Sequence, residues 1–191
     1  MGLKQLKEQN AADKNHYRMK EDWKTEEVME NLPYQLTGAQ KNVWYEIEQD
    51  LRGEKLMTRL VQGDVGSGKT IVAFLAMIMT AENGYQSAIM VPTEVLARQH
   101  YEALTKLLKE NELLEQYRPV LLTGSNTAKE KRQIYEAIAS GATRMIVGTH
   151  ALIQEKVTYE SLGLVITDEQ HRFGVRQREE FSSKGQKPNI L

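Results

Sequence analysis

Residues 63–70 read GDVGSGKT, which matches the pattern G-x-x-x-x-G-K-[ST] between a short and a longer apolar run. Glycines at positions 63, 66 and 68 let the backbone turn tightly around a polyphosphate. Lys69 can reach the β- and γ-phosphates, and Thr70 can offer its hydroxyl to Mg²⁺. The segment therefore predicts a phosphate-binding loop, whose candidate contacts are Gly63, Asp64, Val65, Gly66, Ser67, Gly68, Lys69 and Thr70.

The segments on either side of the loop support this interpretation. Leu60 and Val61 are typical of a strand that enters the loop, and the almost unbroken apolar run 71–80 predicts a helix buried against a sheet. Such a helix would direct its positive end at the bound anion. A glycine-rich turn before a helix is the simpler alternative, and the strand and helix around it favour the phosphate loop.

Composition limits the class of protein. The chain has 191 residues, 40% of them hydrophobic and 27% charged, which fits one globular domain. The absence of cysteine excludes disulfides and thiolate metal sites. No apolar run is long enough to cross a bilayer and the first ten residues resemble no signal peptide, so we expect a cytoplasmic protein with no membrane partner. The net charge of −1 means that any nucleic-acid contact must come from a local face.

The first 31 residues are rich in Lys, Glu, Asn and Gln. This composition predicts a linker or tail, partly helical, that docks weakly through Trp23 onto a domain formed by residues 32–191. Within that domain, Thr37 is a candidate helix N-cap, and Gln40 lies three residues later as a capping box requires. The apolar spacing that follows predicts a packed helix face at Val43, Trp44, Ile47 and Leu51.

Gln40 has a second possible role. Its amide can accept a hydrogen bond from N6 of adenine and donate one to N7 at the same time. The residues alone leave helix capping and adenine recognition open.

Strand-like and helix-like segments alternate through the rest of the chain. Strands are expected at 86–91, 119–122, 144–147 and 162–167, with helices at 93–117 and 127–140. The expected inward stripes are Val95, Leu96, Tyr101, Leu104, Leu107 and Leu108 on the first helix and Ile134, Tyr135 and Ile138 on the second. Buried strands separated by helices predict an α/β three-layer sandwich with a mostly parallel central sheet, which binds ligands at the carboxyl ends of its strands.

An acidic pair follows the strand at 162–167. Asp168 could hold Mg²⁺ from the side opposite Thr70, and Glu169 could polarise the attacking water as general base. A solvated pair of acids is the alternative, and the phosphate loop favours the catalytic one. His171 and Gln170 fit hydrogen bonding near the γ-phosphate or to a neighbouring domain better than metal binding, because Mg²⁺ prefers oxygen.

Six motifs together resemble the first RecA-like motor domain, a P-loop NTPase, of a superfamily 2 helicase. They are LTGAQ (36–40), GDVGSGKT, PTEVLARQH (92–100), LTGS (122–125), IVGTHALIQ (146–154) and DEQHRFGVRQR (168–178). The similarity is greatest to the RecG family of bacterial DNA helicases. The transcription-repair coupling translocases share a segment related to RFGV but carry a box that resembles DEEH, so Gln170 and the pair Gln177-Arg178 favour RecG.

The resemblance implies several residue roles. Lys69, Asp168 and Glu169 would be catalytic, Thr70 and Asp168 would hold Mg²⁺, and Leu36 and Gln40 would contact the adenine of ATP. DNA would lie near Thr93, Arg98, Thr123, Thr149 and His150, each of which, taken singly, also fits a helix cap or a surface position. Coupling to DNA or to a partner domain would involve Gln170, His171, Arg172, Phe173, Gln177 and Arg178.

By the same resemblance, the parent protein would use ATP to remodel branched or duplex DNA at replication forks and Holliday junctions. Its partners would include a second RecA-like domain that supplies an arginine finger and an N-terminal wedge domain, both outside this chain. We therefore expect the isolated chain to bind ATP and Mg²⁺ weakly and to hydrolyse ATP poorly. The alternatives are a transcription-repair coupling translocase and a nucleotide-binding module without a motor role; a GTPase switch would need an N-K-x-D motif, which the sequence lacks.

Overall fold

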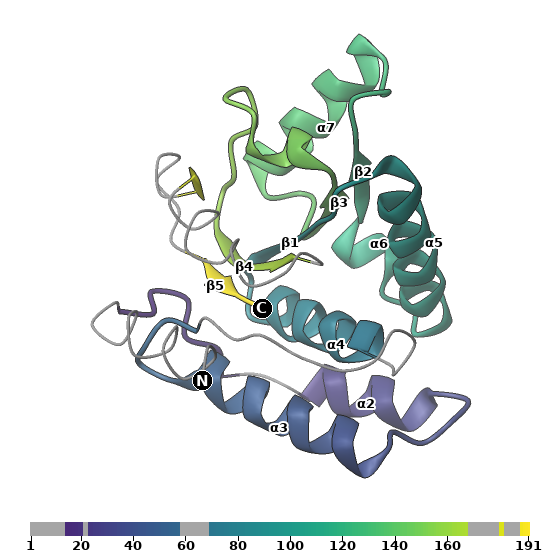
Figure 1. Ribbon diagram of the computed structural model, residues 1–191, viewed down its shortest axis with the longest axis vertical. Helices are drawn as coiled ribbons and strands as arrows, with labels where there is room; N and C mark the ends of the chain where they lie inside the picture. The colour runs from purple at the N-terminus through teal and green to yellow at the C-terminus, as the bar shows by residue number, and fades with distance from the viewer. Residues whose placement is uncertain (1–13, 21–22, 58–68, 168–179, 182–187) are drawn as a thin grey trace.

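The computed structural model describes residues 14–20, 23–57, 69–167, 180–181 and 188–191. Within them a five-stranded sheet forms the centre of the molecule (Figure 1). Every strand pair is parallel and the spatial order is β2-β3-β1-β4-β5, which confirms the predicted parallel sheet. The strands are β1 (Gln86–Met90), β2 (Val120–Leu122), β3 (Met145–Gly148), β4 (Leu162–Thr167) and β5 (Asn189–Ile190).

The last residues of four strands lie side by side. Met90 pairs with Gly148 on one side and with Thr167 on the other, and Gly148 pairs with Leu122. The segments that follow β1, β2, β3 and β4 therefore all begin at one edge of the sheet, as expected for a parallel sheet that binds its ligand there.

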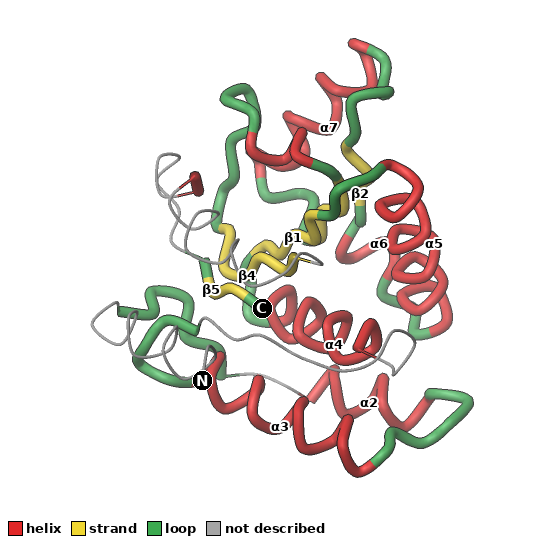
Figure 2. Tube along the Cα trace, in the orientation of Figure 1, coloured by secondary structure: helices red, strands yellow, loops and turns green. Residues whose placement is uncertain are grey.

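Alternate strand residues supply two separate cores, one on each face of the sheet. In β1, Ile89 packs with α3 (Gly38–Arg52), α4 (Lys69–Glu82) and α5 (Glu94–Glu110), whereas Ala88 and Met90 pack with the other face. That second core includes Ile138 of α7 (Ala128–Ser140) and Leu152 of the 3₁₀ helix η1 (His150–Ile153). Helices thus cover both faces, which confirms the three-layer sandwich (Figure 2).

Helix α4 is buried along almost its whole length. Its buried residues include Phe74, Leu75 and Met77. Its neighbours are the sheet on one side and α2 (Trp23–Asn31) and α3 on the other (Figure 1). Because the helix is enclosed by protein all around, it has no need of a polar face, which explains the unbroken apolar run in the sequence.

Three helices begin at the predicted threonines. Thr37 and Gln40 form a reciprocal capping box at α3, and Thr127 and Glu130 form another at α7. Thr93 caps α5 by accepting a hydrogen bond from the backbone N–H of Leu96. These local signals were readable because each uses a side chain within three residues of the groups it satisfies.

Two expectations about the α5 region were wrong. The single helix predicted up to Tyr117 ends at Glu110, and the short α6 (Leu114–Tyr117) follows a turn. Asn111 closes α5 by donating from its side chain to the Leu107 carbonyl at 2.9 Å, and Glu112 has a positive φ of 57°. Val95, predicted in the buried stripe, is 67% exposed because it lies in the first turn of α5, beyond the sheet edge.

The N-terminal segment packs on the helical layer through residues other than Trp23. Trp23 is 50% exposed at the start of α2 (Trp23–Asn31), so its predicted role as anchor is wrong. Met19, Thr25 and Val28 are buried instead, and the Thr80 hydroxyl of α4 lies 3.6 Å from the Met19 sulfur. Side chains on both sides of the aromatic residue, and not the ring itself, therefore hold this segment, while the domain boundary after residue 31 stays a prediction.

Candidate nucleotide and nucleic-acid site

The phosphate-binding candidates Lys69 and Thr70 form the start of α4. Both residues are exposed, whereas the next residue, Ile71, is buried together with most of the helix. An ammonium and a hydroxyl thus lie at the open amino end of a helix whose backbone N–H groups favour anions. This arrangement suits a phosphate chain, and residues 63–68 of the predicted loop lie outside the described part of the structure.

The short strand β5 joins the approaches to both halves of the predicted nucleotide site. The Ile190 N–H donates to the Met57 carbonyl at 2.9 Å on one side, and the Leu191 N–H donates to the Val165 carbonyl at 2.9 Å on the other. The Thr167 N–H donates to the Leu191 carbonyl at 3.2 Å. The segment that leads to the glycine loop and the strand that leads to Asp168 are therefore held on opposite sides of the same strand.

The acidic and coupling candidates cannot be compared with the structure. Asp168, Glu169, Gln170, His171, Arg172, Phe173, Gln177 and Arg178 all lie outside the described residues. Their roles, and the distance between Thr70 and Asp168, remain predictions.

Gln40 performs its capping role. Its Oε1 accepts a hydrogen bond from the Thr37 N–H at 2.8 Å, and its own N–H donates to the Thr37 hydroxyl at 3.1 Å. Leu36, the other adenine candidate, is buried in the core next to this cap. The capping role is thus confirmed, while adenine recognition by Leu36 and Gln40 stays a prediction.

The five DNA-binding candidates lie on the segments that follow β1, β2 and β3. The Thr93 hydroxyl caps α5 and the Thr149 hydroxyl caps η1, accepting from the Ala151 N–H at 3.5 Å. Thr123 is buried, whereas Arg98 and His150 are exposed. The structure therefore brings these positions to one sheet edge, but it engages two of the hydroxyls in helix caps.

Glu94 ties two of these segments together, a contact that the sequence did not predict. Its carboxylate accepts the Ser125 N–H at 3.1 Å, and the hydroxyls of Ser125 and Thr123 lie 3.1 Å apart. Hydrogen bonds from Ser125 lower the pKa of Glu94, with smaller contributions from Thr123 and from the positive charge of Arg98. No local sequence pattern predicts this hydrogen bond, because Glu94 and Ser125 lie 31 residues apart.

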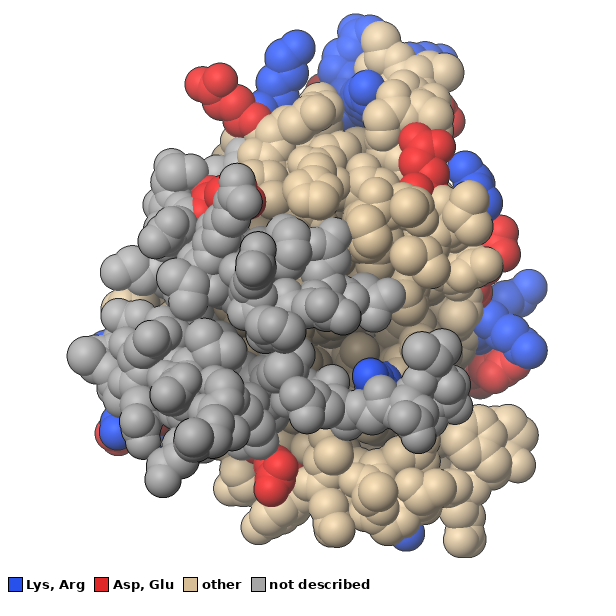
Figure 3. Space-filling model, viewed as in Figure 1, with Lys and Arg blue, Asp and Glu red and all other residues tan. Residues whose placement is uncertain are grey.

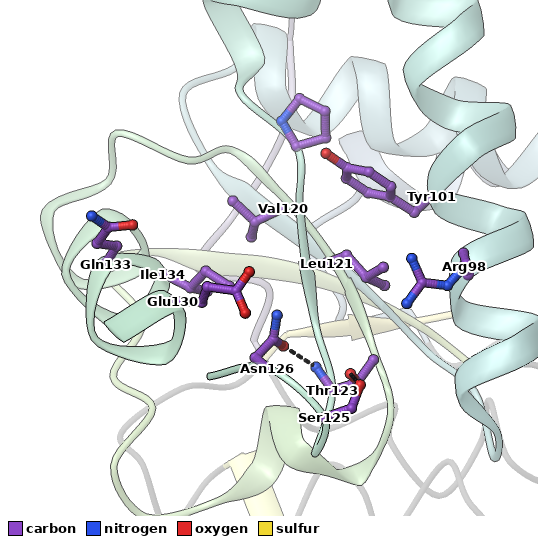
Figure 4. Close-up of a pocket in the computed structure, with 11 residues that line it drawn as sticks. Arg98, Tyr101, Val120, Leu121, Thr123, Ser125, Asn126, Glu130, Gln133 and Ile134 are labelled. Atoms are coloured by element: carbon purple, nitrogen blue, oxygen red, sulfur yellow. Dashed lines mark hydrogen bonds between the residues drawn. The ribbon is translucent and has the colours of Figure 1, made fainter. Parts of the chain in front are cut away.

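A pocket of about 440 Å³ opens beside this edge, between α5, β2 and α7 (Figure 4). Arg98 and Tyr101 reach into it from α5, and Gln133 and Glu130 line it from α7 (Figure 4). At its lower end the Thr123 N–H donates to Asn126 Oδ1 at 2.8 Å. Backbone and polar side chains thus leave a hollow next to the strand ends, which sequence patterns gave no means of predicting.

Charge on the described surface is mixed. On the face shown in Figure 3, Lys and Arg side chains alternate with Asp and Glu around the rim of the described part. This mixture of charges on the face shown agrees with the net charge of −1.

Comparison with known proteins identifies the family. Residues 37–187 match the family model described as DEAD/DEAH box helicase. The chain belongs to the DEAD/DEAH box helicase family. Among curated relatives it is 47% identical, over its whole length, to the ATP-dependent DNA helicase RecG of Streptococcus pneumoniae, and 46% identical over 91% of its length to that of Bacillus subtilis. This DEAD/DEAH box chain spans 28% and 25% of the length of those two relatives.

Solved structures agree with this assignment. The chain matches the structure of RecG bound to a three-way DNA junction with a TM-score of 0.82 and 39% identity, covering 99% of this chain and 25% of that one. The DEAD-box helicase Mss116 shares the fold, with a TM-score of 0.65 at 17% identity over 92% of this chain and 38% of the other. The predicted resemblance to RecG and the predicted RecA-like fold are both confirmed.

None of the helices that the structure describes is both long and apolar enough to cross a bilayer.

Proposed function

We propose that this chain is the ATP-binding lobe of a RecG-type, ATP-dependent DNA helicase that remodels branched DNA. The observation that carries the proposal is the in-register ending of β1, β2, β3 and β4, with the exposed Lys69 and Thr70 at the start of the buried helix α4. The likeness to RecG over the whole chain supports this assignment over a transcription-repair coupling translocase.

ATP and Mg²⁺ would bind at the amino end of α4. Lys69 would contact the β- and γ-phosphates, and the Thr70 hydroxyl would contact the metal, with Asp168 as the carboxylate on the opposite side. Hydroxyl and carboxylate oxygens are ligands that Mg²⁺ accepts, so this donor set fits the ion. Bound Mg²⁺ would neutralise charge on the phosphates, and Glu169 would accept a proton from the attacking water.

DNA would lie across the segments that follow β1, β2 and β3. Because the Thr93 and Thr149 hydroxyls cap helices, we infer that these segments contact phosphate through backbone N–H groups and through the exposed Arg98. The related RecG was solved on a three-way DNA junction, which supports branched DNA as the substrate of the parent protein.

The isolated chain would turn ATP over slowly. It spans about a quarter of its RecG relatives, and an arginine finger from a second RecA-like domain contributes roughly 10³ to 10⁵ in turnover. Substrate remodelling would also need the wedge domain of the parent protein.

The decisive experiment measures binding of a fluorescent ADP analogue with Mg²⁺ to this chain. Lys69→Ala should abolish binding, whereas Lys106→Ala, which removes the same charge from an exposed position on α5, should not. Equal affinity of the two variants would refute the proposed nucleotide site.

A second pair of variants separates the two roles of Gln40. Both Gln40→Ala and Thr37→Ala break the capping box. Only Gln40→Ala should abolish the preference for ADP over GDP if the amide reads adenine. If the two variants prefer ADP over GDP to the same degree, Gln40 caps the helix and does not recognise adenine.

A further inference from the structure

Two buried asparagines at opposite ends of the chain contact each other. The Asn189 Nδ2 donates to the Asn15 Oδ1 at 3.3 Å across 174 residues of sequence. The side chains are 0% and 2% exposed, and both positions fall outside residues 37–187, which match the helicase family model. None of the helicase motifs assigns either residue a role.

Asn189 also binds the two segments that lead into the candidate nucleotide site. Its Oδ1 accepts the Met57 N–H at 2.8 Å, and its Nδ2 donates to the Gly163 carbonyl of β4 at 3.0 Å. Met57 precedes the glycine loop by a few residues, and β4 ends one residue before Asp168. One amide therefore fixes the position of the loop's approach relative to the strand that carries the acidic pair.

Asn15 extends this network to α3. Its Nδ2 donates to the carbonyls of Leu51 at 3.3 Å and Gly53 at 3.0 Å, where α3 ends. Its Oδ1 also accepts the Tyr17 N–H at 3.0 Å. Gln40, the adenine candidate, lies in the first turn of the same helix. The pair Asn15–Asn189 therefore connects α3 to Met57, which precedes the phosphate loop.

Asparagine suits this position chemically. Its short side chain carries one acceptor oxygen and two donor hydrogens, so it can bind a backbone N–H and backbone carbonyls at once without burying a charge. An apolar residue of similar size would remove all of these hydrogen bonds from the backbone groups that the amide joins.

We propose that Asn15 and Asn189 form an amide clasp that holds Met57, on the approach to the glycine loop, against the first residues of β4, and that nucleotide binding depends on this connection. The clasp rests on the proposed function, and both asparagines are positioning residues that act through Met57 and β4. Since Asn15 belongs to the segment before the helicase motifs, that segment becomes part of the nucleotide-binding unit.

The test compares Asn189→Leu with a matched variant, Gln86→Met. Gln86 is also a fully buried amide; it donates to the carbonyls of Ile138 and Thr143 and accepts the N–H groups of Glu160 and Ser161, but none of these partners belongs to the segment before the glycine loop. Both variants should unfold at lower denaturant concentration than the wild-type chain. Only Asn189→Leu should also weaken Mg²⁺-ADP binding, measured where both variants are folded, by about 10- to 100-fold, as for loss of an outer contact of a site.

A KM-against-kcat comparison excludes a purely structural effect. Partial unfolding lowers the apparent kcat of a sample but leaves KM unchanged, so a raised KM for Mg²⁺-ATP in Asn189→Leu reports on the site itself. Asn15→Ala, which removes the other half of the clasp, should raise KM in the same direction by a smaller factor. It also keeps the proposal testable if Asn189→Leu does not fold.

Each outcome decides between the two proposals. Wild-type affinity in Asn189→Leu and Asn15→Ala, with binding still abolished in Lys69→Ala, would overturn the clasp and leave the proposed function intact. Weakening in Gln86→Met equal to that in Asn189→Leu would also overturn it. If the wild-type chain binds no nucleotide, the proposed function fails and the clasp fails with it.

Discussion

The two ends of the central sheet are constructed differently. At the amino end, the buried Gln86 bonds four backbone groups, and the partly exposed Arg144 donates to the Gly84 carbonyl at 2.6 Å. At the carboxyl end, the side chains of Arg98 and His150 are exposed, and the hydroxyls of Thr93 and Thr149 cap helices. We infer that polar side chains at the amino end of the sheet mainly stabilise the fold, whereas those at the carboxyl end remain accessible to a ligand.

The largest stability effect should therefore come from the amino end. Gln86→Met removes four hydrogen bonds at once, those to the Ile138 and Thr143 carbonyls and those from the backbone N–H groups of Glu160 and Ser161. We expect the free energy of unfolding to fall by at least about 3 kcal/mol, as judged by chemical denaturation. A loss no greater than that of a surface substitution would contradict the contrast between the two ends.

Gly148→Ala tests how closely the backbone is packed where the strands end. A Cβ at Gly148 would overlap the Leu122 carbonyl oxygen and would lie 2.9 Å from the Leu152 Cδ2. We expect a loss of about 1–3 kcal/mol in the free energy of unfolding. The control is Gly124→Ala two residues beyond β2, where a Cβ would meet nothing within 4 Å and thermal unfolding should not change.

Two threonine caps provide a smaller and more selective comparison. Thr93→Ala at the carboxyl edge and Thr37→Ala at the start of α3, outside the segments proposed to contact DNA, each remove one N-cap, which costs about 1 kcal/mol of unfolding free energy. Only Thr93→Ala should also weaken binding of a branched DNA by the parent helicase, measured by fluorescence anisotropy. If both variants lose DNA binding to a similar degree, the proposal that the carboxyl edge of the sheet contacts DNA would be contradicted.

The smallest effect at neutral pH belongs to Tyr117. Burial, with a contribution from the negative charge of Glu82, raises the pKa of its hydroxyl from 10.0 to about 12. The neutral hydroxyl is therefore favoured in the folded chain, and the resulting stability is present below pH 10 and is lost as the pH rises from about 10 to 12.

Tyr117→Phe removes this titration. Its stability should fall less steeply than that of the wild-type chain between pH 10 and 12, and should change little at pH 7. The exposed Tyr45 provides the control variant Tyr45→Phe, which should follow the wild-type curve. Wild-type alkaline behaviour in Tyr117→Phe would show that this hydroxyl does not contribute.

Local patterns predicted the architecture well. The parallel sheet follows from short apolar strands separated by helices, and the capping box at Thr37 follows from the spacing of three residues to Gln40. The break after Glu110 was missed because the apolar spacing continues through Leu114 and Tyr117, so only the side-chain bond of Asn111 marks the end of α5.

Long-range contacts were not predictable in the same way. The pattern placed the DNA candidates at one sheet edge, yet it gave no sign that Glu94 would bind the Ser125 N–H. The strand β5 was also missed, because two residues are too few for any periodicity. Trp23 was predicted to anchor the N-terminal segment because of its size, but the buried residues of this segment include the smaller Val28 and Met19.

The bond between Asn15 and Asn189 has a consequence for how the protein is made. A ribosome supplies Asn15 first and Asn189 only 174 residues later. Until β5 has emerged, the nascent chain lacks both the strand that pairs with β4 and the amide that holds Met57. We therefore expect nascent chains that stall before that point not to bind ATP. Incomplete helicases would then not hydrolyse it.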